Sequence, residues 1–120
     1  MEWVLDGDYV DKKGIDKYAK AHQNEVVLCF GNLDRLIRML NGGVTLQQAM
    51  HCGFFSDEGE DVYRIGQQRK GMRETRLYIF ARITGGVIKV LTIGDKSTQQ
   101  RDVRWCHQWS REFKAEVQNS

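Results

Sequence analysis

The residues best suited to chemistry in this 120-residue chain are basic, and they gather in its second half. Residues 1–62 carry 6 basic and 11 acidic side chains, a net charge of −5, whereas residues 63–120 carry 12 basic and 5 acidic side chains, a net charge of +7. This division favours an anionic partner for the second half. Alternatively, the two halves pack together and partly neutralise each other. The basic residues concerned are Arg69, Lys70, Arg73, Arg76, Arg82, Lys89, Lys96 and Arg101.

One short segment combines cations with aromatic rings at a spacing of two. Arg76, Tyr78, Phe80 and Arg82 alternate with apolar residues, which places all four on one face of a predicted strand. A cationic surface can hold a phosphate backbone, and aromatic rings can stack on unpaired bases. The alternative is that the rings belong to the core beneath a helix and that the arginines only face solvent.

Other kinds of chemistry find little support in the sequence. It contains no GxGxxG, GxxxxGK[ST], HExxH or GxSxG motif, so no cofactor is predicted. Cys29, Cys52 and Cys106 are odd in number and widely separated, which predicts neither a disulfide framework nor a metal site but reduced thiols in a cytoplasmic protein. The longest strongly apolar stretch, Val26–Phe30, is too short for a bilayer, and the acidic N-terminus has no signal-peptide core, so no membrane contact or secretion is expected.

Helical spacing dominates the first third of the chain after a possible edge strand at Glu2–Leu5. From Ile15 to Leu40, apolar residues recur at steps of three and four, which predicts one long helix or two abutting helices, with a possible kink near Gly31. The apolar run Val26–Phe30 could instead be a buried strand. Asn41-Gly42-Gly43 ends the helical pattern.

A short helix and a loop are predicted next. Thr45 and Gln48 have the spacing of a capping box, which predicts a helix to about Cys52 that ends at Gly53. Ser56–Asp61 reads as an acidic loop.

The spacing then changes to that of strands. Asp61–Gln67 is a candidate strand, and Glu74–Ile83 is a stronger one because it alternates throughout. Thr84-Gly85-Gly86 predicts a tight turn into a central strand over Val87–Ile93, so residues 74–93 should form an antiparallel hairpin.

A last helix completes the predicted fold. Ser97 or Thr98 can cap it, Asp102 lies in its first turn, and it should run to about Val117. The whole chain, residues 1–120, is therefore predicted to be a single α+β domain. In this fold, N-terminal helices pack on an antiparallel sheet of three to four strands, and a C-terminal helix follows.

Residues 74–103, ETRLYIFARITGGVIKVLTIGDKSTQQRDV, resemble the last strands and the helix entry of RelE/ParE-type toxins, in particular their HigB-like branch. The features that carry the resemblance are an E-x-R strand and a DK-x-x-Q-x-x-D turn that enters a helix. In this chain they are Glu74, Arg76, Asp95, Lys96, Gln99 and Asp102.

The resemblance implies the toxin of a type II toxin–antitoxin pair, an endoribonuclease that needs no metal, cleaves mRNA, often on the ribosome, and so inhibits translation. Its partner would be an antitoxin encoded nearby. Carried over, the resemblance makes Arg73, Arg76 and Lys96 the candidate catalytic residues, with His107 as a possible acid or base. The candidate RNA-binding residues are Arg69, Lys70, Tyr78, Arg82 and Arg101.

Two other functions stay open at this stage. A member of the same fold class could bind a protein, such as gyrase or an antitoxin, through the same sheet without catalysis. A nucleic-acid-binding module without cleavage is the other possibility. Lys70 is a weaker catalytic candidate than Arg76, and His107 lies more than a helical turn beyond the motif.

Overall fold

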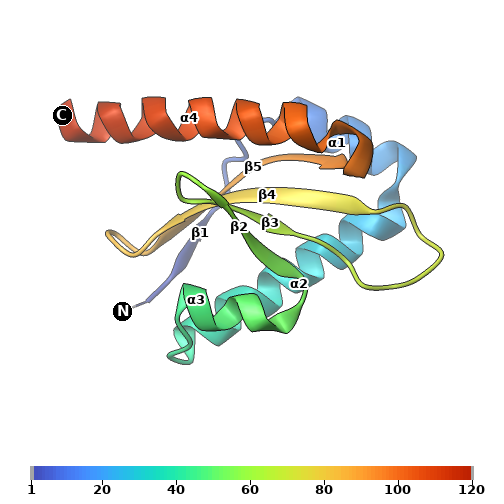
Figure 1. Ribbon diagram of the computed structural model, residues 1–120, viewed down its shortest axis with the longest axis horizontal. Helices are drawn as coiled ribbons and strands as arrows, with labels where there is room; N and C mark the ends of the chain where they lie inside the picture. Colours follow the sequence, from blue (N-terminus) through green and yellow to red (C-terminus); the bar gives the residue numbers. More distant parts are fainter. Residues whose placement is uncertain (1, 120) are drawn as a thin grey trace.

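The computed structural model describes residues 2–119, within which one mixed sheet separates two unequal helical layers (Figure 1). The sheet has the order β1-β5-β4-β3-β2. The predicted α+β class is confirmed. In chain order the elements are β1 Val4–Asp6, α1 Lys12–Ala21, α2 Gln23–Asn41, α3 Leu46–Ala49, η1 Met50–Cys52, β2 Phe55–Gly59, β3 Val62–Ile65, β4 Thr75–Arg82, β5 Val87–Asp95, η2 Lys96–Thr98 and α4 Gln99–Asn119.

The predicted hairpin over residues 74–93 is confirmed. β4 and β5 pair antiparallel from Thr75 opposite Asp95 to Arg82 opposite Val87, with a bulge between Tyr78 and Ile79. The turn depends on glycine, because Gly85 and Gly86 both have positive φ. The register fixes which ends of the two strands meet.

The sheet is larger than the sequence predicts. β1 confirms the possible edge strand near the N-terminus, and it runs parallel to β5, so the sheet is mixed and not purely antiparallel. β2 forms where an acidic loop was expected, so that prediction was wrong. In β2 only Phe55 is fully buried, so the sequence has no apolar alternation there from which a strand could be predicted. Glu60 and Asp61 both have positive φ and form the tight turn from β2 into β3.

The long helical pattern resolves into two helices that meet at His22. His22 has non-helical dihedral angles, φ −137° and ψ 51°, so the chain changes direction there rather than at Gly31, which lies inside α2. Val26–Phe30 is helical, which excludes the alternative of a buried strand. The capping box of Thr45 and Gln48 is present at the start of α3.

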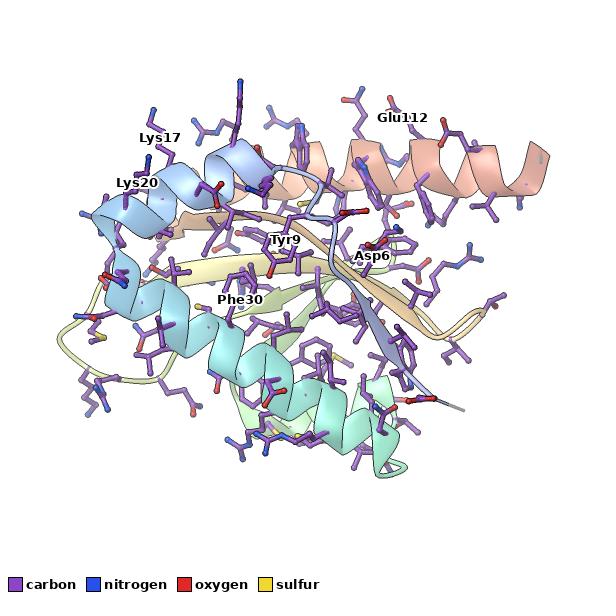
Figure 2. The ribbon with its side chains drawn as sticks, turned by 180° about the vertical axis from the view of Figure 1, so that it is seen from behind. Asp6, Tyr9, Lys17, Lys20, Phe30 and Glu112 are labelled. Carbon is purple, nitrogen blue, oxygen red and sulfur yellow. The ribbon has the colours of Figure 1, made fainter. Side chains whose placement is uncertain are left out.

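α1, α2 and α3 cover one face of the sheet and build the larger core. α2 buries a regular apolar stripe against β3 and β4: Val26, Cys29, Leu33, Leu36 and Leu40. Tyr9, in the segment between β1 and α1, stacks on Phe30 of α2 with ring centroids 5.6 Å apart (Figure 2). This layer holds most of the buried apolar side chains.

α4 crosses the opposite face over a smaller core. Phe80 makes edge contacts with Trp109 and Phe113, whose rings stack with centroids 5.0 Å apart. The short helix η2, which leads into α4, is capped by Asp95, because the Asp95 carboxylate accepts from the backbone N–H of Ser97. Ser97 and Thr98, the predicted caps of the last helix, lie within η2.

No helix within residues 2–119 is both long enough and apolar enough to cross a membrane.

Candidate functional site

The β4–β5 register brings the three candidate catalytic residues to one end of the sheet. Arg76 pairs with Gly94, and the N–H of Lys96 donates to the carbonyl of Glu74. At this end Arg73 donates to the Asp95 carboxylate at 2.9 Å, and Lys96 lies 3.7 Å from Glu74. The hydroxyl of Ser97, together with the Arg73 guanidinium, lowers the pKa of Asp95. Arg73 and Lys96 thus already have carboxylate partners.

Arg69 and Lys70 extend the same end of the molecule. Both lie in the loop that joins β3 to β4 and are exposed. Neither forms an ion pair with any described residue. They can contribute a diffuse positive potential, but the protein does not hold them in a fixed geometry.

Tyr78 does not occupy the place predicted for it. Its ring is fully buried beneath α4, so the ring cannot stack on an RNA base in this structure. Phe80 is buried there as well, which supports the alternative of core packing for both rings. The sequence spacing was right about the face, but it could not reveal that α4 covers it.

Arg82 lies away from the strand end that holds Arg73, whereas Arg101 lines a separate groove together with Asp95, the partner of Arg73. Arg82 lies six residues beyond Arg76 on β4, a separation of roughly 20 Å at the rise of a strand. The Arg82 guanidinium is 3.6 Å from the Asp61 carboxylate. Arg101 extends from α4 beside Asp102, at 3.7 Å. Arg82 therefore cannot contact the same phosphate as Arg76.

His107 packs against the hairpin of β2 and β3. Its Nε2 lies 2.6 Å from the carbonyl oxygen of Glu58. Because a carbonyl only accepts, Nε2 carries the proton and Nδ1 is the acceptor atom of the ring. This contact gives His107 a packing role, and it leaves one nitrogen able to accept a proton.

The structure adds two residues to the site that the sequence did not single out. Arg64 on β3 pairs with Tyr78 on β4, so Arg64 and Arg76 are diagonal neighbours on one face of the sheet. Arg64 lies 3.9 Å from the Glu58 carboxylate, and both are mostly shielded from solvent. We call Glu58, Arg64, Arg76 and Tyr78 the sheet-face cluster.

A signal for Arg64 was present in the alternation of Val62, Arg64 and Gly66 on one face of β3. No such signal existed for Glu58, because it sits at the bulge of β2 inside an acidic run. Arg64 and Arg76 line one small cavity of about 180 Å³ together with Ser56 and Gln67.

Two polar atoms of the sheet-face cluster are buried without a partner. These are the Nε of Arg76 and the hydroxyl of Tyr78, and they are the only such side-chain atoms within the described residues. Burial raises the pKa of Tyr78, and the Asp102 and Glu58 carboxylates add to the rise while the Arg76 guanidinium opposes it. Unsatisfied buried polar groups are costly, and they concentrate where a structure serves something other than stability.

The sheet-face cluster is suited to binding a phosphate. Two guanidinium groups on neighbouring strands can each present paired N–H donors to phosphate oxygens. The nearby Glu58 carboxylate can accept a proton. Across residues 2–119, no three His, Cys, Asp or Glu side chains gather in an arrangement that could hold a metal ion.

The known proteins give no further guide to this site. No family model matches the chain, and neither the curated proteins nor the solved structures include a significant match.

Proposed function

We propose that this chain is the toxin of a type II toxin–antitoxin pair and cleaves RNA without a metal. One observation carries the proposal. Arg64 and Arg76 come from neighbouring strands and face the same small cavity, and Arg64 lies 3.9 Å from the Glu58 carboxylate. The resemblance of residues 74–103 to RelE/ParE-type toxins supports the same reading.

The proposed reaction is an internal transfer of the phosphoryl group. The 2′-hydroxyl oxygen of one nucleotide attacks the adjacent phosphorus, and the bond from phosphorus to the 5′-oxygen of the next nucleotide breaks. Glu58 takes the proton from the 2′-hydroxyl, and a nearby acid returns one to the leaving 5′-oxygen. Arg64 and Arg76 stabilise the charge that develops on the phosphorane oxygens.

Arg73 and Lys96 have a supporting part in this proposal. Both lie at the strand end next to Arg76. Glu74, the partner of Lys96, is 61% exposed, whereas Asp95, the partner of Arg73, is 14% exposed. A phosphate can displace Glu74 from Lys96 at low cost because exposed ion pairs contribute little. Lys96 is also the nearest amine that could return a proton to the leaving oxygen.

The protein partner we propose is an antitoxin encoded nearby, with an acidic or apolar segment that covers the basic strand end. Opposite charge would speed the association more than it raises the affinity. Purification from the native operon should give a complex, and a lone monomer under those conditions would contradict this part of the proposal.

A second function, binding a protein without catalysis, is favoured by one specific observation. Tyr78 is buried, and Arg73 and Lys96 are paired with carboxylates, so the free surface resembles a docking patch more than an open catalytic site. The experiment below separates the two functions.

The test is RNA cleavage in EDTA, with and without ribosomes, by the parent chain and by Arg76→Ala and Arg64→Ala. Each variant should cleave roughly a hundredfold more slowly, about 3 kcal/mol, because one cation that stabilises developing charge is lost. The products should end in 2′,3′-cyclic phosphates.

Arg38→Ala is the matched control for that test. Arg38 is an exposed cation of α2, and its replacement by alanine changes the net charge by the same amount as the loss of Arg64 or Arg76. If Arg76→Ala and Arg64→Ala cleave like Arg38→Ala, the sheet-face cluster is not a catalytic site. If the parent arrests growth without cleaving RNA, the protein-binding function is correct instead.

A further inference from the structure

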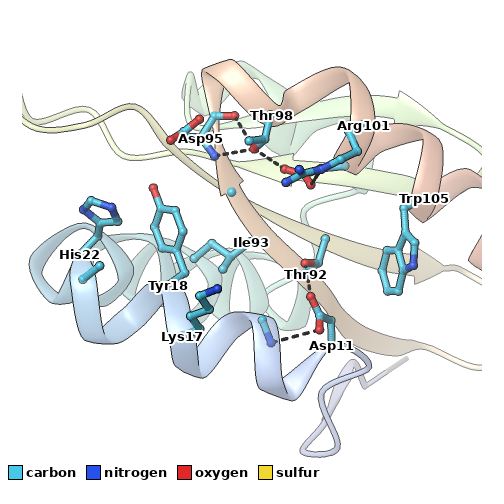
Figure 3. A pocket seen from close by; sticks show the side chains of 14 residues that line it. Asp11, Lys17, Tyr18, His22, Thr92, Ile93, Asp95, Thr98, Arg101 and Trp105 are labelled. Atoms are coloured by element: carbon cyan, nitrogen blue, oxygen red, sulfur yellow. Dashed lines mark hydrogen bonds and ion pairs between the residues drawn. The ribbon is translucent and has the colours of Figure 1, made fainter.

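A groove of about 520 Å³ lies between α1 and α4, outside the sheet-face cluster (Figure 3). Its floor is the outer edge of β5. β1 pairs only with Val87–Lys89, and the following segment donates to the carbonyls of Val90 and Leu91. From Thr92 to Asp95 no strand of the described chain lies along this edge. At Gly94 the side chains of Thr98 and Asp102 approach the backbone so closely that no side chain would fit there.

The wall formed by α4 carries a cation and an exposed aromatic ring. Arg101 and Trp105 are one helical turn apart and both line the groove. Trp105 is 42% exposed, although Cys106 and Ser110 beside it are fully buried. Its side chain therefore lines the groove and stays partly open to solvent.

The wall formed by α1 carries Lys17, Tyr18 and His22. Lys17 and Lys20 extend outward from α1 (Figure 2). Within the described residues no carboxylate lies within ion-pair distance of Lys17. The Tyr18 hydroxyl is shared with Thr75 at 2.8 Å, so its ring is held in place rather than mobile.

The three carboxylates in the groove all have partners within the protein. Asp11 accepts from the N–H of Gly14 and the hydroxyl of Thr92. Asp95 is held by Arg73 and Ser97, and Asp102 accepts from the hydroxyl of Thr98. Arg101 also lies 3.7 Å from Asp102, but its side chain is 78% exposed, whereas that of Asp102 is 10% exposed. The exposed charged residues that line the groove are therefore the cations Lys17 and Arg101.

A ligand that matches these walls must combine a flat aromatic ring with a negative charge. An unpaired nucleotide does so, because its base can stack on Trp105 while its phosphate lies near Arg101 or Lys17. An acidic peptide would match only the charge.

The position of the groove fits the same ligand. Gly94 in the groove floor is the register partner of Arg76, so the groove adjoins the sheet-face cluster. We infer that the groove binds an unpaired nucleotide of single-stranded RNA that flanks the scissile phosphate. This inference rests on the proposed function, and it makes Trp105 and Arg101 residues that position the RNA strand beside the sheet-face cluster.

The test measures binding without cleavage. The full chain is titrated with a short single-stranded RNA in which every 2′-hydroxyl is methylated, and the indole N–H signals are followed by NMR. The signal of Trp105 should shift, while that of Trp3, which is 8% exposed, should not. Trp105→Ala should weaken binding roughly tenfold, and Trp105→Phe should retain most of the affinity because it keeps a stacking surface.

The charge contribution has its own control. Arg101→Ala should weaken binding and reduce its salt dependence, whereas Arg38→Ala should change neither. Equal affinity of Trp105→Ala and the parent would overturn the inference. So would a shift of the Trp105 signal by a poly-glutamate peptide and not by the RNA, which would assign the groove to an acidic peptide.

Failure of the proposed function would look different. Arg76→Ala should lose cleavage of unmodified RNA and still shift the Trp105 signal with methylated RNA. Trp105→Ala should lose affinity and still cleave at saturating RNA. If the parent chain cleaves no RNA but its Trp105 signal still shifts with methylated RNA, only the catalytic proposal is rejected.

Discussion

The two faces of the sheet differ in how they are built, and the difference separates stability from chemistry. α2 presents Leu33, Leu36 and Leu40 to one face, all buried. α4 presents Asp102, Cys106 and Ser110 to the other, where they are equally buried but polar or small. A helix stripe of this second kind removes far less apolar surface from water.

Unsatisfied polar atoms lie only on the α4 face within the described residues. The Nε of Arg76 and the hydroxyl of Tyr78 are both there, next to Asp102, whose pKa is raised mainly by burial. Desolvation also raises the pKa of the Cys106 thiol to about 12. A fold selected only for stability would replace such groups with apolar ones. We therefore expect substitutions on the α2 face to lower mainly the stability of the protein, and substitutions on the α4 face to lower mainly its function.

The largest effect should come from the α2 face. Leu36→Ala should lower the free energy of unfolding by roughly 2–5 kcal/mol, because it leaves a cavity in a fully packed core. Val27→Ala on the exposed side of the same helix is the matched control and should change it by about 0.5 kcal/mol or less. Urea denaturation followed by circular dichroism measures both. A small effect of Leu36→Ala would remove the basis of the comparison.

A smaller effect is expected from the aromatic cluster beneath α4. Phe113→Ala should cost about 1–2 kcal/mol, because the ring is only partly buried although it contacts Phe80 and Trp109. The same denaturation assay applies. A cost equal to that of Leu36→Ala would mean that the two faces contribute alike.

The cap at the start of η2, which leads into α4, should contribute less again. Asp95→Ala removes the carboxylate that accepts from Ser97 and from Arg73, and should cost about 1 kcal/mol. Asp95→Asn keeps an acceptor for the cap but loses the charge that holds Arg73. Similar stabilities for the two variants would show that the ion pair matters more than the cap.

The sequence predicted the parts of the fold that repeat regularly. The alternation of Glu74–Ile83 and the glycines of the turn led to the correct hairpin, and the Thr45 capping box was also correct. β2 was missed because a strand with acidic residues at an exposed edge has no apolar pattern. Two abutting helices were one of the predicted alternatives and are confirmed, but the break lies at His22 and not near Gly31.

The site could be predicted only in part, for a different physical reason. Period-two spacing placed Arg76 and Tyr78 on the same face, which is correct. Whether a face is open depends on α4, which is distant in the sequence, so the burial of Tyr78 could not be foreseen. Glu58 and Arg64 come together through the pairing of β2 with β3, a contact that exists only once the fold is known.

The smallest effect, and the one that most directly compares stability with chemistry, concerns Asp102. Burial raises the pKa of Asp102 above its ordinary value, despite the opposing hydrogen bond from Thr98. A carboxyl whose pKa is higher in the folded state binds its proton more tightly there than in the unfolded chain. It therefore adds stability at low pH, and this contribution is lost as the pH rises through the folded-state pKa.

Asp102→Asn should remove that dependence. The amide oxygen can still accept from Thr98, and no charge has to be buried at neutral pH. The stability of the variant relative to the parent should therefore increase from pH 4 to pH 7, measured as the difference in free energy of unfolding. Thr98→Val should lower stability at both pH values because it removes the donor. A difference between Asp102→Asn and the parent that stays constant with pH would mean that the carboxylate is not strained by burial, and that the polar character of the α4 face has little cost in stability.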